Sequence, residues 1–585
     1  MRRTSWFTLF ALLSLAGPSA ATEDVLIKTR DGATLSVTLA LPDPKPPGRI
    51  PTILVFDIYT NPETLKAQAE EFAARGYAGV VADVRGKRLS PDNIVPYEHD
   101  AADTHAVLDW IVKQPWSDGK AGMVGGSYTG FTAWAATKHR HPALKGIAVS
   151  AAAIPGFGLP MYNNVFLTAN YQWPFYVTNN KFLDEALNSD NQRWWSLTRK
   201  WFESGRPFRE IDAVDGTPNP LFQRWLMHPD YDKYWQAMVP YKGDFARINI
   251  PVLTITGYYD DAQVSALQYF KQHMAAGRQP EHYLVIGPYD HLGTHWRKKP
   301  EVLRDYTIDP VAQIDSQELK LQFMDYVLKG KPKPALLENL VNYEVMGANV
   351  WRHTTSLGAV HGGVPMRLYF SSQKSEGMLS LVNQQPPAGL ITTHTVDLAD
   401  RVKFHNFHYY PFPIVQGPLP YITESLFLSQ PFEAPTVISG SFTGDLIVKI
   451  NKKDFDLGVT VYEAMPGGKL FHLGYTMQRA SYAEDPTKRH LLSPGKPAHL
   501  KFETTMVSRQ MTPGSRLLVL VDAIKNPNAQ INYGTGKDVS DESVKDAGDP
   551  LTIEIQGGSY FEIPLDNSWG QPPFPSKKGQ PSSQD

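Results

Sequence analysis

The chain has 585 residues, of which 42% are hydrophobic and 20% charged, and its formal net charge at pH 7 is −2. This composition is typical of a globular protein of about two to four domains, and it offers no surplus of positive charge for a nucleic acid or an anionic membrane. The chain has no cysteine, which excludes a thiol nucleophile, a thiolate metal site and disulfides.

The first 21 residues have the pattern of a signal peptide. Arg2 and Arg3 precede an apolar run over residues 6–15, and small residues lead to Ala21, after which we expect cleavage. The alternative is an uncleaved membrane anchor, but the run is shorter than the roughly 20 residues that a spanning helix requires. The arginine pair leaves a twin-arginine signal open. We therefore expect a periplasmic or secreted protein with no membrane span after cleavage.

Strands and helices alternate in the part of the chain that follows. Residues 24–42 alternate apolar and polar side chains around an Asp-Gly pair, which predicts a β-hairpin. Residues 50–56 form an unbroken apolar run, as in a strand that is buried on both faces, and residues 62–76 then have helical character. The alternation continues and predicts an α/β domain with a parallel sheet over residues 22–154.

The rest of the chain divides into four segments. Residues 155–245 are rich in aromatic side chains at helical spacing, which predicts a helical cap inserted into the sheet domain. The strand–helix pattern returns over residues 246–334 and completes an α/β-hydrolase sheet. Short strands and frequent Pro-Gly turns predict a C-terminal β-sandwich of the jelly-roll type over residues 335–566. The polar, proline-rich residues 567–585 predict a disordered tail.

Ser127 falls between a short strand and a helix, in the stretch "GMVGGSYTG". A serine nucleophile on such an elbow usually has glycine two residues before and two after it, because small residues let the helix start close to the strand. Gly125 fits this pattern, but Thr129 holds the second position and the glycine comes one residue later, as Gly130. The elbow by itself is therefore an imperfect match.

A serine nucleophile needs a base and a carboxylate that orients the base. In an α/β-hydrolase these three residues follow successive strands in the order Ser, Asp, His. Asp260 follows the apolar stretch "PVLTITGYY" and His291 follows "HYLVIGPYD", so both lie at strand ends where such sheets bind ligands. Asp261 and His295 are the reserve candidates.

An oxyanion formed at Ser127 would need hydrogen-bond donors. The elbow geometry supplies the backbone N–H of Tyr128. A second donor is expected from the loop after the strand that ends near residue 56, where Tyr59 offers a hydroxyl group. The alternative for Tyr59 is a packing role.

Several motifs together resemble the X-Pro dipeptidyl-peptidase-like (CocE/NonD) serine hydrolases, the family of cocaine esterase, glutaryl-7-aminocephalosporanic acid acylase and α-amino acid ester hydrolase. They include "QPWSDGK" followed by a Gly-Gly-Ser-Tyr elbow, "DVRG", "WLMHPDYDKYW", "PVLTITGYYD" and "LVIGPYDH". The C-terminal stretches "NKKDFDLGVTVYEAMPGGK" and "MTPGSRL" resemble the family's jelly-roll domain. The resemblance covers nearly the whole mature chain.

The resemblance implies a role for each candidate residue. Ser127 matches the nucleophile, His291 the base and Asp260 the acid of the catalytic triad. Tyr59 matches the tyrosine whose hydroxyl joins the Tyr128 N–H in the oxyanion hole.

Two departures affect the loops around Ser127. The family usually has glycine where Thr129 stands, and we expect the elbow to form nevertheless because Gly130 is beside it. The glycine-rich continuation after "DVRG" is replaced by "KRLSPD" at residues 87–92, which predicts reshaped loops near the site.

A third departure concerns the substrate. α-Amino acid ester hydrolases carry acidic residues two and three positions after the triad aspartate, where this chain has Ala262 and Gln263. This weakens the case for an α-amino ester. Other acids that could hold a substrate amine lie in the cap but fit a solvated helix face: Asp184, Glu185 and Asp190.

The sequence therefore predicts an exported serine esterase or acylase that cleaves a small ester or amide, with an apolar group favoured by the aromatic cap. The alternatives are an X-Pro dipeptidyl-peptidase acting on short peptides, an α-amino acid ester hydrolase, and a carbohydrate-binding protein with a decayed hydrolase domain. No cofactor or metal ligand set is evident, and a homo-oligomer is compatible with the family.

Overall fold

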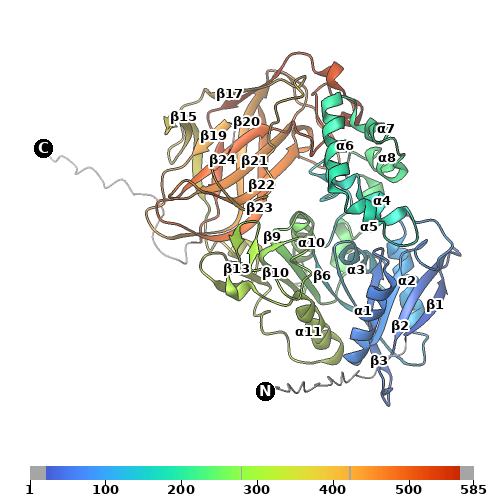
Figure 1. Ribbon diagram of the computed structural model, residues 1–585. Coiled ribbons are helices and arrows are strands. Elements are labelled where there is room, and N and C mark those ends of the chain that lie inside the picture. Colours follow the sequence, from blue (N-terminus) through green and yellow to red (C-terminus); the bar gives the residue numbers. More distant parts are fainter. Residues whose placement is uncertain (1–21, 278–279, 420–422, 424, 567–585) are drawn as a thin grey trace, which may run out of the picture.

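The computed structural model describes residues 22–277, 280–419, 423 and 425–566. The predicted signal peptide (1–21) and tail (567–585) lie outside these residues. Figure 1 shows three parts, with a mixed sheet and its helices below, a helical cap at the upper right and a second, all-β part at the upper left. None of the helices in the described part of the chain has the length and apolar character to cross a membrane.

The first sheet has ten strands in the order β1-β2-β4-β3-β5-β6-β9-β10-β13-β14, and the strands from β4 to β13 pair in parallel. Parallel central strands are covered on both faces, which explains their unbroken apolar runs. The strands are β1 (Thr22–Lys28), β2 (Thr34–Ala40), β3 (Ile50–Asp57), β4 (Ala78–Asp83), β5 (Ser117–Gly126), β6 (Leu144–Ser150), β9 (Val252–Tyr259), β10 (His282–Asp290), β13 (Val341–Val345) and β14 (Val350–Thr354).

Five helices cover the two faces of this sheet. Two of them share one apolar cluster with the sheet and the other three share a second cluster on the opposite face. The first pair is α1 (Pro62–Ala74) and α11 (Ser316–Lys329), and the others are α2 (Asp100–Ile111), α3 (Tyr128–Lys138) and α10 (Gln263–Ala275). The predicted start of α1 is confirmed, because the Asn61 side chain accepts hydrogen bonds from the amides of Glu63 and Thr64. The α/β-hydrolase architecture predicted from the alternation is therefore confirmed.

The cap lies between β6 and β9 in the chain. Its elements are β7 (Met161–Tyr162), β8 (Val165–Phe166), α4 (Trp173–Thr178), α5 (Glu185–Asn188), α6 (Asn191–Ser204), α7 (Ile211–Asp215), α8 (Pro220–Leu226) and α9 (Lys233–Gln236). A fully buried lysine from the "KRLSPD" segment, Lys87, donates hydrogen bonds to the cap carbonyls of Val177, Asn180 and Phe182 at 3.0, 3.2 and 2.6 Å. The segment that departs from the family pattern therefore anchors the cap.

Over the described residues the second large sheet has twelve strands, and it forms the predicted C-terminal β-sandwich. Its strands are β15 (Met366–Ser375), β16 (Met378–Val382), β17 (Leu390–Val396), β18 (Val415–Gln416), β19 (Ser425–Leu428), β20 (Thr436–Ile450), β21 (Asp456–Ala464), β22 (Leu470–Arg479), β23 (Ala498–Met511), β24 (Arg516–Ala523), β25 (Leu551–Gln556) and β26 (Tyr560–Ile563). A small ribbon of β11 (Val302–Leu303) and β12 (Tyr306–Thr307) stands apart.

Two strands that follow the domain boundary predicted at residue 335 belong to the first sheet. β13 and β14 follow that position, yet β13 pairs in parallel with β10 and β14 pairs with β13, so both extend the first sheet. Sequence periodicity does not say which sheet a strand joins, so it does not reveal this pairing. The β-sandwich strands begin at Met366.

Candidate active site

Ser127 lies on a sharp turn between β5 and α3. Its backbone has φ of 57° and ψ of −119°, a conformation that a residue with a side chain rarely adopts. A Cβ at Gly125 would lie 2.3 Å from the carbonyl oxygen of Thr129, and one at Gly130 would lie 3.0 Å from the Cβ of Ala152. The helix can therefore start this close to the strand only because Gly125 has no side chain.

Thr129 stabilises the turn through its own side chain. The Thr129 hydroxyl accepts the amide hydrogen of Gly126 at 2.7 Å and lies 2.8 Å from the Gly126 carbonyl oxygen, to which it can donate. The hydroxyl therefore bonds the backbone of the residue that precedes Ser127. This explains how the elbow forms although glycine is absent at position 129.

The structure brings Ser127, His291 and Asp260 together. His291 Nε2 lies 2.9 Å from Ser127 Oγ, and His291 Nδ1 lies 3.0 Å from Asp260 Oδ1. Asp260 directly follows β9 and His291 directly follows β10, so neighbouring parallel strands set their separation. Asp260 is 3% exposed and also accepts hydrogen bonds from the Thr256 hydroxyl at 2.7 Å and the Ala262 amide at 2.9 Å. The carboxylate is thus held in one orientation.

The two reserve candidates take different positions. The ring of His295 lies 5.4 Å from that of His291, but its Nδ1 lies 2.8 Å from the Ser150 hydroxyl and not at Ser127. Asp261 instead reaches the same imidazole as Asp260, with Oδ1 3.0 Å from His291 Nδ1. Its side chain is 60% exposed. The sequence suggested Asp261 only as a substitute for Asp260, whereas the structure places both carboxylates at His291.

The charges around His291 favour a protonated imidazole. Burial by itself lowers the pKa of His291, but the carboxylates of Asp261 and Asp260 outweigh burial and raise the pKa well above its ordinary value. Burial and the neighbouring His291 hold the pKa of His295 well below its ordinary value. His291 is therefore the histidine here that can carry a positive charge.

Tyr59 and Tyr128, the two residues predicted to supply oxyanion donors, both lie beside Ser127. Tyr59 Oη lies 3.4 Å from Ser127 Oγ, and burial raises the pKa of Tyr59, so its hydroxyl keeps its proton. Tyr128 is the first residue of α3, and an amide in the first turn of a helix has no partner within the helix. Both groups can therefore donate to an oxygen beside Ser127.

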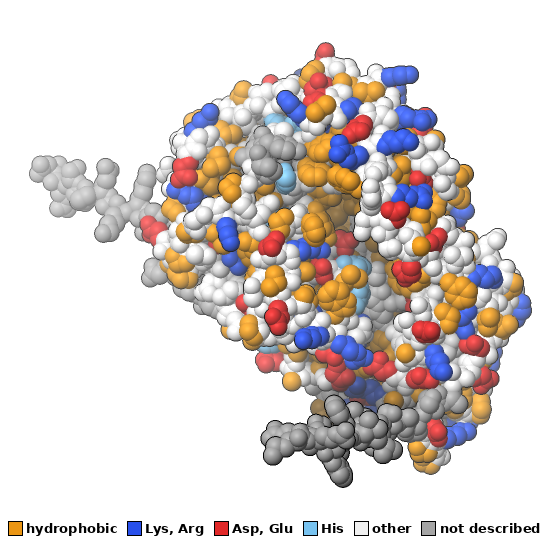
Figure 2. All heavy atoms as spheres, viewed as in Figure 1, with side chains coloured by type: hydrophobic (Ala, Val, Ile, Leu, Met, Phe, Trp, Pro, Cys, Tyr) orange, Lys and Arg blue, Asp and Glu red, His pale blue; other side chains and the backbone are white. Residues whose placement is uncertain are grey.

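Aromatic side chains of cap helix α4 pack against these tyrosines. Trp173 stacks on Tyr128 with ring centroids 5.8 Å apart, and the ring of Tyr176 lies 6.2 Å from that of Tyr59. Figure 2 shows a hollow between the cap and the rest of the molecule in which hydrophobic and histidine side chains are visible. Sequence reasoning missed Trp173, because nothing local distinguishes it among 13 tryptophans.

The three cap acids considered as ligands of a substrate amine form hydrogen bonds within the cap instead. Asp184 accepts the amide hydrogen of Leu187, and Asp190 accepts that of Arg193, so each caps the start of a short helix or of α6. Glu185 accepts a hydrogen bond from the Tyr176 hydroxyl at 3.0 Å. This arrangement supplies no dedicated pair for a substrate amine.

Histidine and carboxylate side chains come within reach of one ion in three groups of the described residues. The groups are His105, Asp109 and His141; His394, His405 and Asp522; and Asp260, Asp261 and His291. The third is the site described above. In the second, the Asp522 carboxylate lies within hydrogen-bond distance of His394 and His405 and also accepts the amide hydrogens of Asn406 and Ala523, so hydrogen bonds occupy its lone pairs.

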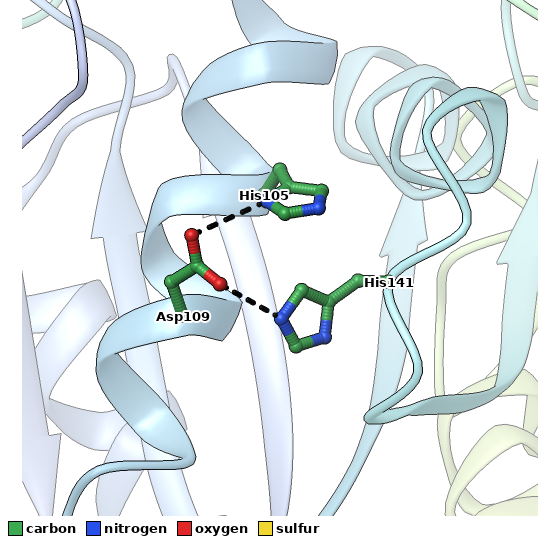
Figure 3. Close-up of side chains that lie close together, drawn as sticks. All are labelled: His105, Asp109 and His141. Carbon is green, nitrogen blue, oxygen red and sulfur yellow. Dashed lines mark hydrogen bonds and ion pairs between the residues drawn. The ribbon is translucent and has the colours of Figure 1, made fainter.

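The first group joins α2 to the loop after α3 (Figure 3). His141 Nδ1 accepts the amide hydrogen of Ala143 at 3.1 Å, so the proton of the neutral ring is on Nε2, which lies 3.2 Å from Asp109 Oδ1. A metal ion would need the lone pair of that Nε2. The geometry therefore fits a hydrogen-bonded cluster, and we assign no metal to it.

Comparisons with known proteins agree with the fold and with a serine hydrolase. Residues 31–293 match the X-Pro dipeptidyl-peptidase (S15 family), and residues 338–556 match the X-Pro dipeptidyl-peptidase C-terminal non-catalytic domain. The chain is 26% identical to the cocaine esterase of Rhodococcus sp. (strain MB1 Bresler) over 565 residues, which are 91% of this chain and 95% of that protein.

Two solved structures share the fold over almost their full length. An aminopeptidase from a marine sediment Thaumarchaeota archaeon has a TM-score of 0.75 at 19% identity, with 96% of this chain and 99% of that chain covered. An α-amino acid ester hydrolase has a TM-score of 0.73 at 20% identity, with 95% of this chain and 100% of that chain covered.

Proposed function

The chain belongs to the X-Pro dipeptidyl-peptidase (S15) family of serine hydrolases, and we propose that it is an esterase or acylase in which Ser127, His291 and Asp260 form the catalytic triad. The contacts among Ser127, His291 and Asp260 argue against the alternative of a binding protein with a decayed hydrolase domain, and failure of a fluorophosphonate probe to label the folded protein would favour it. The observation that carries the proposal is the continuous contact from Ser127 Oγ to His291 at 2.9 Å and from His291 to Asp260 at 3.0 Å.

The geometry supports a two-step acyl transfer. Ser127 Oγ attacks the substrate carbonyl while His291 Nε2 takes the hydroxyl proton, and Asp260 stabilises the imidazolium that results. The Tyr59 hydroxyl and the Tyr128 amide stabilise the oxyanion. His291 then gives its proton to the leaving group, and water, deprotonated by His291, attacks the acyl-enzyme and releases Ser127.

The surroundings of the triad favour an apolar substrate without a charged amine. Trp173 and Tyr176 present aromatic surface beside the oxyanion position. Position 263 is one of the two at which the sequence comparison with α-amino acid ester hydrolases led us to look for an acidic residue. Here the side-chain amide of Gln263 donates hydrogen bonds to the carbonyls of Gly257 and Met506, both at 3.0 Å. A small ester or amide with an apolar group fits this site better than an aminoacyl ester or an X-Pro peptide.

The test is hydrolysis of a panel by the wild type and Ser127→Ala. The panel contains p-nitrophenyl acetate and butyrate, an aminoacyl ester, a glutaryl amide and an X-Pro anilide. We expect p-nitrophenyl ester hydrolysis to be abolished by the substitution. Preference for the X-Pro anilide would make the protein a dipeptidyl-peptidase, preference for the aminoacyl ester would make it an α-amino acid ester hydrolase, and wild-type rates in Ser127→Ala would refute the triad.

We also propose that the protein is exported. The support is the signal-like pattern of residues 1–21. Amino-terminal sequencing of the protein recovered from the periplasm or the culture medium should begin at residue 22. A chain that retains Met1 in the cell fraction would contradict export.

A further inference from the structure

Two carboxylates face the same nitrogen of His291. The Oδ1 atoms of Asp260 and Asp261 both lie 3.0 Å from His291 Nδ1. Asp260 is enclosed and bonded to Thr256 and Ala262, whereas the Asp261 side chain is 60% exposed. A triad needs one acid, so the second carboxylate calls for its own explanation.

We propose that Asp261 is a second positioning residue for His291, one that sets the basicity of the imidazole together with Asp260. The inference rests on the proposed function, in which His291 is the base. The Nδ1–H group of His291 donates its hydrogen bond to Asp260 Oδ1. The Asp261 carboxylate adds a second negative charge, with its Oδ1 also 3.0 Å from Nδ1. Two negative charges stabilise the imidazolium more than one does.

The other titratable groups near His291 do not cancel this effect. Tyr59 stays protonated because burial raises its pKa, and His295 stays neutral because burial lowers its pKa. Asp290, the residue before His291, is paired with Arg304 at 3.2 Å.

On the β-sandwich side, Tyr409 and Tyr410 lie near Asp261, and burial keeps both protonated by raising their pKa. Asp260 and Asp261 are therefore the charged groups near the imidazole whose charge no neighbouring group named here neutralises. Because Asp261 is exposed, salt should screen its contribution more than that of Asp260.

The consequence appears in the pH dependence of the reaction. His291 must be neutral to accept the Ser127 proton, so activity rises as pH passes the pKa of His291. Removing one of the two negative charges lowers that pKa. In Asp261→Asn the acid limb of kcat/KM should therefore move to lower pH, and it should depend less on ionic strength than in the wild type.

The experiment compares pH profiles of kcat/KM for p-nitrophenyl butyrate at low and high salt. The variants are Asp261→Asn and, as a matched control, Glu301→Gln, which removes an exposed carboxylate in the segment after His291. We expect the acid limb to shift by about half a pH unit or more in Asp261→Asn and not to shift in Glu301→Gln. Asp260→Asn should keep residual activity that falls further in the double variant.

A second readout separates this inference from the proposed function. The pKa of His291 is measured by NMR in Ser127→Ala with and without Asp261→Asn, which needs no turnover. The inference would be overturned if His291 had the same pKa with and without Asp261→Asn, or if Asp261→Asn and the wild type had the same acid limb of kcat/KM. If Ser127→Ala is inactive in the same experiments, the proposed triad is unaffected. A higher KM confined to aminoacyl esters, with the acid limb unmoved, would overturn it too and make Asp261 a ligand of the substrate ammonium.

Discussion

Replacing Tyr59 with phenylalanine isolates one donor of the proposed oxyanion hole. The change removes a hydroxyl that lies 3.4 Å from Ser127 Oγ and keeps the ring, whose centroid lies 6.3 Å from that of Tyr128. Loss of one oxyanion donor typically costs about 100- to 1000-fold in kcat, or about 3–4 kcal/mol of transition-state stabilisation. We expect a loss of that size in kcat with little change in KM, because the donor acts on the charge that develops during reaction.

The assay is steady-state hydrolysis of p-nitrophenyl butyrate, with thermal unfolding as a check on the fold. Tyr176→Phe is the matched control, because its ring neighbours Tyr59 while its hydroxyl binds Glu185 at 3.0 Å, away from Ser127. That variant should stay within about twofold of the wild-type kcat. A Tyr59→Phe enzyme with wild-type kcat, or with a change in KM alone, would show that the Tyr59 hydroxyl does not stabilise the oxyanion.

Three further predictions concern the elbow and one buried acid. Thr129→Val should lower kcat and the unfolding midpoint, because it removes two hydrogen bonds to Gly126 worth about 1 kcal/mol each. Thr129→Ser keeps the hydroxyl and should retain the wild-type kcat and unfolding midpoint, so equal values in the two variants would refute the role of the hydroxyl. Gly125→Ala should abolish activity or folding, because the new Cβ would lie 2.3 Å from the Thr129 carbonyl; a fully active variant would contradict the elbow geometry. Burial raises the pKa of Glu344 from 4.5 to about 10, so the folded protein keeps a proton that the unfolded chain releases, and stability should fall as pH rises between these values. The difference between the unfolding midpoints of Glu344→Gln and the wild type should therefore change in favour of the variant as the pH is raised from about 6 to about 9. A difference that stays constant over this range would show that the pKa of Glu344 is not raised.

The secondary-structure elements and their order can be predicted from local patterns in the chain. The run at residues 50–56 predicts β3 because side-chain periodicity and turn residues are local properties, and Asn61 marks the start of α1 for the same reason. The placement of Asp260 and His291 after strands also follows from the chain, since parallel strands bring their carboxyl ends to one edge of the sheet.

The contacts between side chains depend on the three-dimensional fold and could not be predicted in this way. It places His295 against Ser150, brings Asp261 to His291 and stacks Trp173 on Tyr128. It also joins β13 to β10 across the domain boundary predicted at residue 335. These contacts depend on side-chain directions and on pairing between strands far apart in the chain, and periodicity carries neither kind of information.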